Sequence, residues 1–393
     1  MTSTFRNTSP TFLPWNATLQ KALDRLSLRV QTTHDAAGAE WPYHADPATG
    51  KWELTHDGDW CGGHWVECLR IAAELSGRED LQREALVRTD RLRPYLERDD
   101  QFRGHRFYYS AARQYDLTGD HRLRTLALAA AYAMRSMAMS SNGAMPIGTQ
   151  VQVKSTTLAS RSIVAVDNVH PNLCLDWWAF RQTGDEAFHS GARAHLETTY
   201  RDFVRPDGST VEFIEYDPAS GLPQREFTLL GAHDQSCWSR GQAWAIAGYL
   251  RAWEELRDER YLTVARQLLG YWQRHCADDL IPPWDFMDPA LQTNPGAVPV
   301  DTSAAAIVVE QLARIAVHDE LRAQAPDLMP VLTAMMNGLI GHIAAFEVGL
   351  PEGRLLDGCF NQPRKFANHD ELLWGSAYLL FALFYLKKRA APL

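Results

Sequence analysis

Residues 117–123 read LTGDHRL, and this short junction decides the fold class of the chain. It recurs at residues 75–81 as LSGREDL and at 182–188 as QTGDEAF, with looser copies at 256–262, LRDERYL, and 317–321, VHDEL. A glycine just past a helix end can adopt the left-handed conformation that closes the last turn. An aspartate that follows can cap the next helix. The pattern therefore predicts repeated pairs of helices.

Apolar periodicity on either side of these junctions predicts twelve helices. The expected ranges are 16–32, 62–76, 80–95, 105–117, 121–137, 169–183, 185–203, 237–256, 258–274, 302–317, 325–345 and 370–388. Several of them, such as residues 127–139 and 238–253, are apolar on nearly every face, which is typical of helices buried on both sides. We therefore expect an all-α fold, an (α/α)6 barrel with six helices inside and six outside.

Composition limits the class of protein. Residues 1–393 are expected to form a single domain with a short irregular N-terminal segment, because 46% hydrophobic and 22% charged residues are ordinary for a globular chain. The net charge of −9 argues against a nucleic-acid partner. The start has no signal-peptide layout, and we expect no membrane-spanning segment. Six cysteines without a CxxC pair favour reduced thiols in the cytoplasm.

Long connections between the helices carry tryptophan, histidine, aspartate, glycine and proline. They fall at residues 33–61, 138–168, 204–236, 275–301 and 346–369. Long loops in a compact domain are usually functional, so we expect the site at the loop-rich end of the barrel. Residues 211–216 alternate as a strand would, and small β-hairpins closing the barrel are an alternative explanation of the same loops. The thirteen tryptophans fit either core packing or stacking on sugar rings.

Residues 57–65, DGDWCGGHW, form the first candidate constellation. Trp60 and Trp65 are candidate platforms for a sugar ring. Asp57 and Asp59 are explained equally well as caps of the helix that follows.

Residues 103–109, RGHRFYY, form the second candidate constellation. Arg103 and Arg106 beside a histidine suggest binding of an anion. His105 and Tyr109 could serve as a base and an acid.

Residues 164–173, VAVDNVHPNL, place an aspartate after a run of apolar residues. Burial raises the pKa of a carboxyl group, which suits Asp167 to act as a general acid near neutral pH. The alternative is that Asp167 is a helix cap with Pro171 in the first turn. His170 is a further candidate contact to substrate.

Residues 231–244, GAHDQSCWSRGQAW, concentrate polar groups against two tryptophans at a helix start. Arg240 is the best candidate for contact with a sugar hydroxyl or carboxylate. The remaining candidate binding residues here and in the PPWDF segment, 282–286, are His233, Asp234, Trp238, Gln242 and Trp284.

Several of these stretches together resemble a known family. The chain resembles the unsaturated glucuronyl hydrolases of glycoside hydrolase family 88, and more distantly the unsaturated rhamnogalacturonyl hydrolases of family 105. The matching segments span nearly the whole chain in order: 57–63, 117–120, 234–244, 283–286, 301–306 and 371–375. The run Trp-Ser-Arg-Gly-Gln-Ala-Trp is the most specific of them.

The resemblance implies an (α/α)6 barrel that releases a terminal 4,5-unsaturated uronic acid by hydrating a vinyl ether. An aspartate matching Asp167 would donate a proton to C4, water would add at C5, and the resulting hemiketal would fall apart. Trp238 and Arg240 would lie beside the substrate. The implied partner is an oligosaccharide that contains uronic acid, bound by a monomer or a homodimer.

The chain departs from the family at positions of the active site. Where the family carries His-Asp-x-Gly-Phe, this chain has RGHRF at 103–107, so that Gly104 replaces the second carboxylate. A family histidine is replaced near Glu212, and a family glutamine by Leu230. The segment after Asp167 is one residue longer than in the family, which leaves open whether Asp167 or Asn168 holds the catalytic position.

Other functions remain open from the sequence. A carbohydrate lyase would need a base and a cation, which these residues offer: His105, Tyr108 or Tyr109, with Arg103, Arg106 or Arg240. A sugar-binding protein without catalysis and a sugar epimerase are further alternatives. No metal is expected, because the scattered histidines lack ligand spacing, and no cofactor is expected, because the chain has no phosphate loop or dinucleotide fingerprint.

Overall fold

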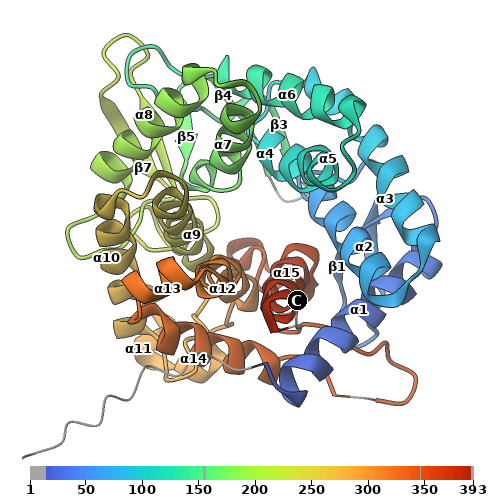
Figure 1. Cartoon of the computed structure of the whole chain (residues 1–393). Helices are drawn as coiled ribbons and strands as arrows, with labels where there is room; N and C mark the ends of the chain where they lie inside the picture. Colours follow the sequence, from blue (N-terminus) through green and yellow to red (C-terminus); the bar gives the residue numbers. More distant parts are fainter. Residues whose placement is uncertain (1–14, 154–155, 346, 391–393) are drawn as a thin grey trace, which may run out of the picture.

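A computed structural model describes residues 15–153, 156–345 and 347–390 of the chain. Residues 1–14, most of the segment expected to be irregular, lie outside the described part. Within that part, helices form two concentric rings around one axis (Figure 1).

The inner ring contains six helical segments whose residues are buried on nearly all sides. They are α2 (Gly62–Ser76), α4 (Arg103–Phe107) continued by the π-turn η2 (Tyr108–Ala112) and α5 (Arg113–Thr118), α7 (Asn172–Thr183), α9 (Ser239–Leu256), α12 (Thr302–Val317) and α15 (Leu373–Ala390). Each contacts the next, and α15 returns to α2, so the ring is closed. The apolar faces predicted from the sequence are buried here.

The outer ring packs against the inner one. Its helices are α1 (Ala17–Ala37), α3 (Glu79–Arg91), α6 (His121–Arg135), α8 (Glu186–Phe203), α10 (Glu259–His275) and α14 (Leu328–Gly341), with the short α13 (Asp319–Gln324) before the last. Inner and outer helices alternate along the chain, so each pair forms a hairpin. The predicted (α/α)6 barrel is confirmed, and all twelve expected helices are present with boundaries shifted by a few residues.

The junctions close the helices largely as the sequence predicts. Gly77, Gly119 and Gly184 end α2, α5 and α7 in the left-handed region, at φ of 72°, 69° and 69°. Asp120 and Asp185 then cap α6 and α8 with their side chains. The first junction differs from the prediction, because Arg78 occupies the cap position of α3 and makes no side-chain cap bond.

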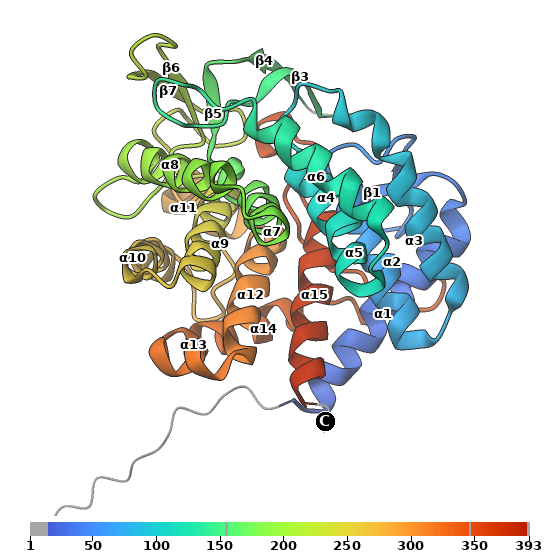
Figure 2. The same ribbon diagram turned by 45° about the horizontal axis from the view of Figure 1, so that its top comes forward.

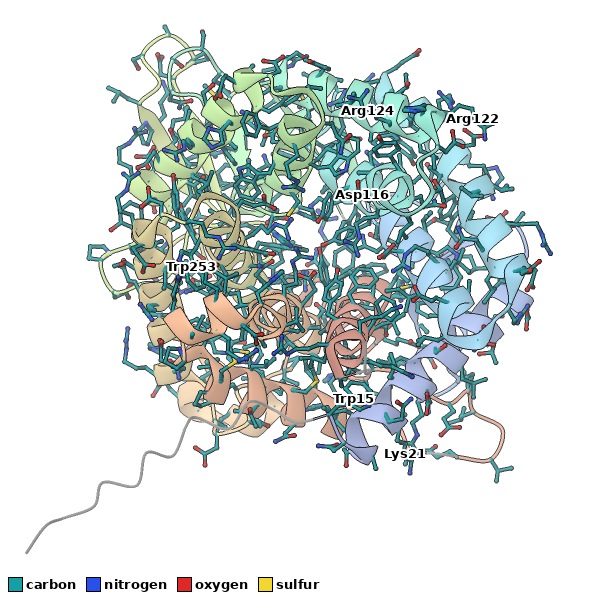
Figure 3. All side chains as sticks on the ribbon, viewed as in Figure 1. Trp15, Lys21, Asp116, Arg122, Arg124 and Trp253 are labelled. Carbon is teal, nitrogen blue, oxygen red and sulfur yellow. The ribbon has the colours of Figure 1, made fainter. Side chains whose placement is uncertain are left out.

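Side chains tie neighbouring hairpins together at the short-turn end. Arg124 of α6, labelled in Figure 3, donates a hydrogen bond of 2.7 Å to the backbone carbonyl of Gln182 at the end of α7. Trp178 of α7 donates through its indole nitrogen to Asp116 of α5 at 2.8 Å. Such bonds fix the hairpins relative to one another.

Short antiparallel strands gather at the opposite end (Figure 2). They form three sheets: β2 (Trp52–Thr55), β1 (Trp41–Ala45) and β8 (Glu371–Leu372); β3 (Gly148–Val153) and β4 (Thr156–Ser160); and β5 (Ile163–Ala165), β6 (Phe213–Tyr216) and β7 (Pro223–Phe227). The strand expected at 211–216 is therefore present as β6, and hairpins do account for part of the long loops. The small helices α11 (Ala290–Thr293), η1 (Arg93–Leu96), η4 (Pro295–Ala297) and η5 (Gln362–Arg364) complete the connections.

Most of the tryptophans belong to the core. Eight are almost fully buried: Trp41, Trp65, Trp177, Trp178, Trp244, Trp253, Trp272 and Trp374. Trp65 packs inside the barrel, so the prediction that it is an exposed sugar platform is wrong. Among the described helices, none is long and apolar enough to cross a membrane.

Candidate active site

A pocket opens at the loop-rich end of the barrel, as the sequence predicts. Its empty space, counted out into the solvent at its open mouth, is about 660 Å³. Its walls come from five loops and from the start of α9. The lining residues are Trp60, Gln101, Phe102, Ile147, Val151, Leu158, Asp167, Glu212, Phe213, Leu229, Leu230, Trp238, Arg240, Trp244 and Phe360.

Asp167 lies in this pocket with a carboxylate oxygen that has no partner. It follows β5 in the 3-10 turn η3 (Val166–Val169), and its buried Oδ1 accepts no hydrogen bond from any described residue. It does not cap α7, which begins after Pro171 without a side-chain cap. Burial raises the pKa of Asp167 to about 6, while the charge of Arg240 opposes that rise. Asp167 is thus suited to hold and donate a proton near neutral pH.

The structure also separates Asp167 from its neighbour. Asn168 is buried, and its Nδ2 donates 2.8 Å to the carbonyl of Met145 while its Oδ1 accepts from Asn172 at 3.2 Å. Its side chain is therefore held within the packing and does not line the pocket. Of the two residues left open by the sequence, Asp167 is the one that faces the ligand space.

Glu212 brings a second carboxyl group to the same pocket. Its Oε2 accepts from the Thr228 hydroxyl and from the backbone N–H groups of Leu229, at 2.8 Å, and Leu230, at 2.9 Å. Burial raises the pKa of Glu212 to about 7, and the nearby charge of Asp167 adds to the rise. Leu230 lines the wall next to it, in place of the glutamine expected from the family.

Arg240 lies in the pocket wall, but its guanidinium already has partners. Nη1 contacts Asp301 and donates to the carbonyl of Cys359 at 2.7 Å, and Nη2 donates to that of Phe360 at 2.8 Å. The group also stacks over Trp238, 4.6 Å from the ring centre. The charge of Arg240 is balanced by Asp301, so its main role in this structure is to hold the Phe360 loop against the pocket.

Aromatic rings form the pocket floor. Trp60 and Trp244 line it, and the His105 ring lies 5.2 Å from Trp60 and 5.3 Å from Trp244, edge-on to both. His105 is 1% exposed, and burial holds its pKa well below the usual range, so it is neutral. It does not line the pocket, in contrast to the expectation that it acts on the substrate as a base.

His170 and Tyr109 lie deeper along the barrel axis. The His170 ring stacks near Trp244 at 6.1 Å, and the Tyr109 hydroxyl donates to that of Tyr378 at 3.2 Å. Burial raises the pKa of Tyr109 well above its usual value and lowers that of His170 well below. Neither residue is among those that line the pocket.

Arg103 and Arg106 are committed to the fold, so the expectation that they bind an anion is not met. Arg103 donates to three backbone carbonyls between residues 96 and 100. Arg106 pairs with Asp100 at 2.7 Å and donates to the carbonyl of Asp59 at 2.9 Å. Both are nearly fully buried and outside the pocket lining.

Asp57 and Asp59 have local roles different from the predicted cap. The helix α2 begins after Cys61 and has no side-chain cap. The Asp57 carboxylate instead accepts the backbone N–H of Asp59 at 3.1 Å, and Asp59 accepts that of Trp60 at 2.6 Å. These turns place Trp60 at the pocket.

Four further candidates shape the loops around the pocket without lining it. His233 and Asp234 are exposed, and Asp234 accepts the backbone N–H of Thr228 at 3.1 Å. Gln242 donates to the carbonyls of Gly208 and Leu268 at 2.7 and 3.1 Å, and the Trp284 indole donates to Asp288 at 2.7 Å. The polar density of residues 231–244 thus serves mainly to order the chain.

Gly104 stands where the family has its second carboxylate, and the structure explains why a side chain is absent. The helix α4 packs so closely on α7 that a Cβ at 104 would lie 2.4 Å from Cα and 2.5 Å from N of Asn172. The Gly104 N–H also donates to Oδ1 of Asn172 at 2.8 Å. No carboxylate fits here without moving backbone.

Several lining residues were not predicted. Trp244 ends the sequence run that was singled out, but Phe360 comes from a loop in which no residue was singled out from the sequence. Phe102, Leu158, Phe213 and Leu229 give the wall its apolar character. Isolated apolar residues in loops carry no sequence feature that separates them from core packing. In the described ranges, no group of three or more His, Cys, Asp or Glu side chains is arranged to hold a metal ion.

The chain is similar to several known proteins over nearly its whole length. It is 25% identical over 372 residues to the unsaturated chondroitin disaccharide hydrolase of Streptococcus pneumoniae, covering 92% of this chain and 90% of that one. It is 28% identical over 353 residues to the unsaturated glucuronyl hydrolase of Bacillus sp. strain GL1, covering 88% and 90%. A solved structure of an unsaturated glucuronyl hydrolase variant with dGlcA-Glc-Rha-Glc superposes with a TM-score of 0.83 at 27% identity, covering 94% and 97%. No protein-family model matches the chain.

Proposed function

We propose that this unsaturated glucuronyl hydrolase-like enzyme releases a terminal 4,5-unsaturated uronic acid from an oligosaccharide, with Asp167 as its proton donor. The observation that carries the assignment of Asp167 is its unpartnered carboxylate oxygen in an otherwise apolar, tryptophan-lined pocket. A buried carboxyl oxygen without a hydrogen-bond partner lowers the stability of the fold, so its presence in a pocket indicates a function. The similar hydrolases described above support the reaction type.

The pocket suits each stage of vinyl-ether hydration. Trp60 and Trp238 offer apolar surface on which a flat, partly unsaturated sugar ring can stack. Burial raises the pKa of Asp167 to about 6, so that a fraction of this carboxyl group is protonated near neutral pH and can give its proton to C4 of the sugar. Water adds at C5, and the hemiketal that results breaks down to release the oligosaccharide. Apolar walls exclude bulk water and keep the carboxyl pKa high.

A lyase on the same scaffold is less well supported. Its expected bases, His105 and Tyr109, do not line the pocket, and its expected cations, Arg103 and Arg106, bind backbone carbonyls and Asp100. Among the described lining residues, the pocket would then lack a free cation to hold the substrate carboxylate, because Arg240 is already paired with Asp301. A binding protein without catalysis would not need an unpaired Asp167.

The test is a panel of uronic-acid oligosaccharides, some unsaturated at the non-reducing end and some saturated, followed by near-ultraviolet absorbance of the conjugated double bond. We expect loss of absorbance from an unsaturated member and a fall of about 10²-fold or more in kcat for Asp167→Asn. Asp278→Asn, at an exposed position, is the matched control. A rise of absorbance from a saturated substrate would identify a lyase, and unchanged activity of Asp167→Asn would refute the assigned donor.

We further propose that the whole chain acts as one catalytic domain, as a monomer or a homodimer, on a uronic-acid oligosaccharide in the cytoplasm. All six cysteines are free thiols, five of them buried, which supports a reducing compartment. Light scattering of the purified protein decides between monomer and dimer.

A further inference from the structure

The pocket contains two carboxyl groups whose positions are fixed by one backbone pairing. The strands β5 and β6 are antiparallel, with Ala165 opposite Phe213, and the backbone N–H of Val166 donates to the carbonyl of Glu212 at 3.0 Å. Asp167 is the next residue along the chain. Asp167 follows the end of β5 and Glu212 precedes the start of β6, so both side chains line the same pocket, and the charge of Asp167 raises the pKa of Glu212.

Each of these carboxyl groups presents one oxygen without a partner. Glu212 is 5% exposed, and its Oε2 is anchored by the three donors of the 228–230 turn, while its Oε1 is buried and accepts no bond from the described chain. Oδ1 of Asp167 is likewise buried and accepts no hydrogen bond from the described chain. Buried polar atoms are normally satisfied, so a pair of orphaned oxygens in a ligand pocket points to a ligand or a reaction.

No positive charge in the pocket offsets both groups. Arg240 is the only basic residue among those described in the lining, and Asp301 already balances it. Two like charges in an apolar site cannot both ionise without cost, so the pair holds one proton over a range of pH. In such a pair, the protonated carboxyl group can act as an acid and the ionised one as a base.

We propose that Glu212 is a second catalytic carboxyl group. The pair holds one proton, and the reactive form is the one with this proton on Asp167 and with Glu212 ionised, so that Glu212 acts as the base of the hydration. The proposal rests on the function proposed above. It also places the second carboxylate on the residue just before β6, since the close packing at Gly104 leaves no room for one on α4.

The proton balance of the cycle closes. Asp167 gives its proton to C4 as the double bond opens, water forms a bond from its oxygen to C5, and Glu212 takes the proton that this water loses. In the breakdown of the hemiketal, the C5 hydroxyl returns a proton to Asp167 and the ring oxygen takes one from Glu212, as the bond from C5 to the ring oxygen breaks. The hemiacetal left at C1 then breaks its bond to the glycosidic oxygen, which gains a proton as the former ring hydroxyl loses one, and the oligosaccharide leaves. The pair ends the cycle with the single proton it began with.

Kinetics of Glu212→Gln test the catalytic role. The amide keeps an oxygen for the N–H groups of Leu229 and Leu230, so the fold is preserved. We expect kcat to fall about 10²-fold or more, and the bell-shaped pH profile of kcat/KM to lose the limb that reports the base. Glu215→Gln, on the same strand but at the partly exposed pair with Arg225, is the matched control with activity unchanged. A Glu212→Gln enzyme with the activity and pH profile of the wild type would overturn the proposal.

A titration without substrate tests the pairing separately. With carboxyl-¹³C glutamate in the chain, the NMR resonance that disappears in Glu212→Gln identifies this group. We expect Asp167→Asn to lower the pKa of Glu212, because the neighbouring negative charge is gone. An unchanged titration would refute the shared proton. If the wild type consumes no unsaturated oligosaccharide, the proposed function and the catalytic role of Glu212 both fail, while this titration still decides whether the two carboxyls are coupled.

Discussion

Glu212→Gln should make the protein more stable in alkaline solution, even as it removes activity. Burial raises the pKa of Glu212 from its ordinary value of 4.5 to about 7. A raised carboxyl pKa means that the folded state binds more protons than the unfolded state between these values. Stability that is fully present below pH 4.5 is therefore lost as the pH rises through 7. A glutamine at this position carries no such penalty.

The size of the effect follows from the shift. A difference of about 2.5 pH units at about 1.4 kcal/mol each corresponds to roughly 3 kcal/mol, of which most is lost between about pH 5 and pH 8. The variant should thus gain about 2 to 3 kcal/mol relative to the wild type over that interval.

The assay is denaturant unfolding of both proteins at pH 5 and pH 8, with the free energy of unfolding taken from the midpoint and slope. Glu215→Gln should show no comparable dependence on pH, since its side chain is partly exposed. A Glu212→Gln protein whose gain is the same at both pH values would show that Glu212 titrates normally. The raised pKa of Glu212 in the folded protein would then be refuted.

Two other substitutions test the packing around the pocket. Gly104→Ala should lose about 1 to 3 kcal/mol of unfolding free energy, because the new Cβ meets the Asn172 backbone. Gly296→Ala, with open space around it, is the control and should change the stability little. Equal stabilities of the two variants in thermal unfolding would contradict the close approach at Gly104. Arg240→Met should cost about 3 to 5 kcal/mol by leaving Asp301 buried and unpaired, and should lower kcat/KM by releasing the Phe360 loop. An Arg240→Met enzyme of normal stability would show that the loop is held by other contacts.

The helical barrel was predictable because its determinants are local. Gly119 and Gly184 each end a helix in the left-handed conformation, and Asp120 and Asp185 cap the helices that follow. Apolar residues at helical spacing predict which face of each helix is buried. The first junction was predicted less well, since Arg78 stands where a capping side chain was expected.

The active site was predicted only in part. The sequence singled out Asp167 because an aspartate after a run of apolar residues is unusual on local grounds alone, and the structure places it in the pocket lining. Arg103 and Arg106 were assigned to substrate because arginines near a histidine suggest an anion, but their partners are backbone carbonyls and Asp100, which no local pattern reveals. The role of Arg240 was likewise decided by Asp301, 61 residues away.

The sequence by itself determined the alternation of inner and outer helices and the end of the barrel at which the loops gather, because caps, turns and apolar periodicity act over a few residues. Only the tertiary structure decided which polar side chains face the pocket. The pairing of β5 with β6 brings Glu212 beside Asp167, and the close contact of α4 with α7 excludes a side chain at Gly104. These contacts join segments far apart in the chain, so they form only once the barrel has closed.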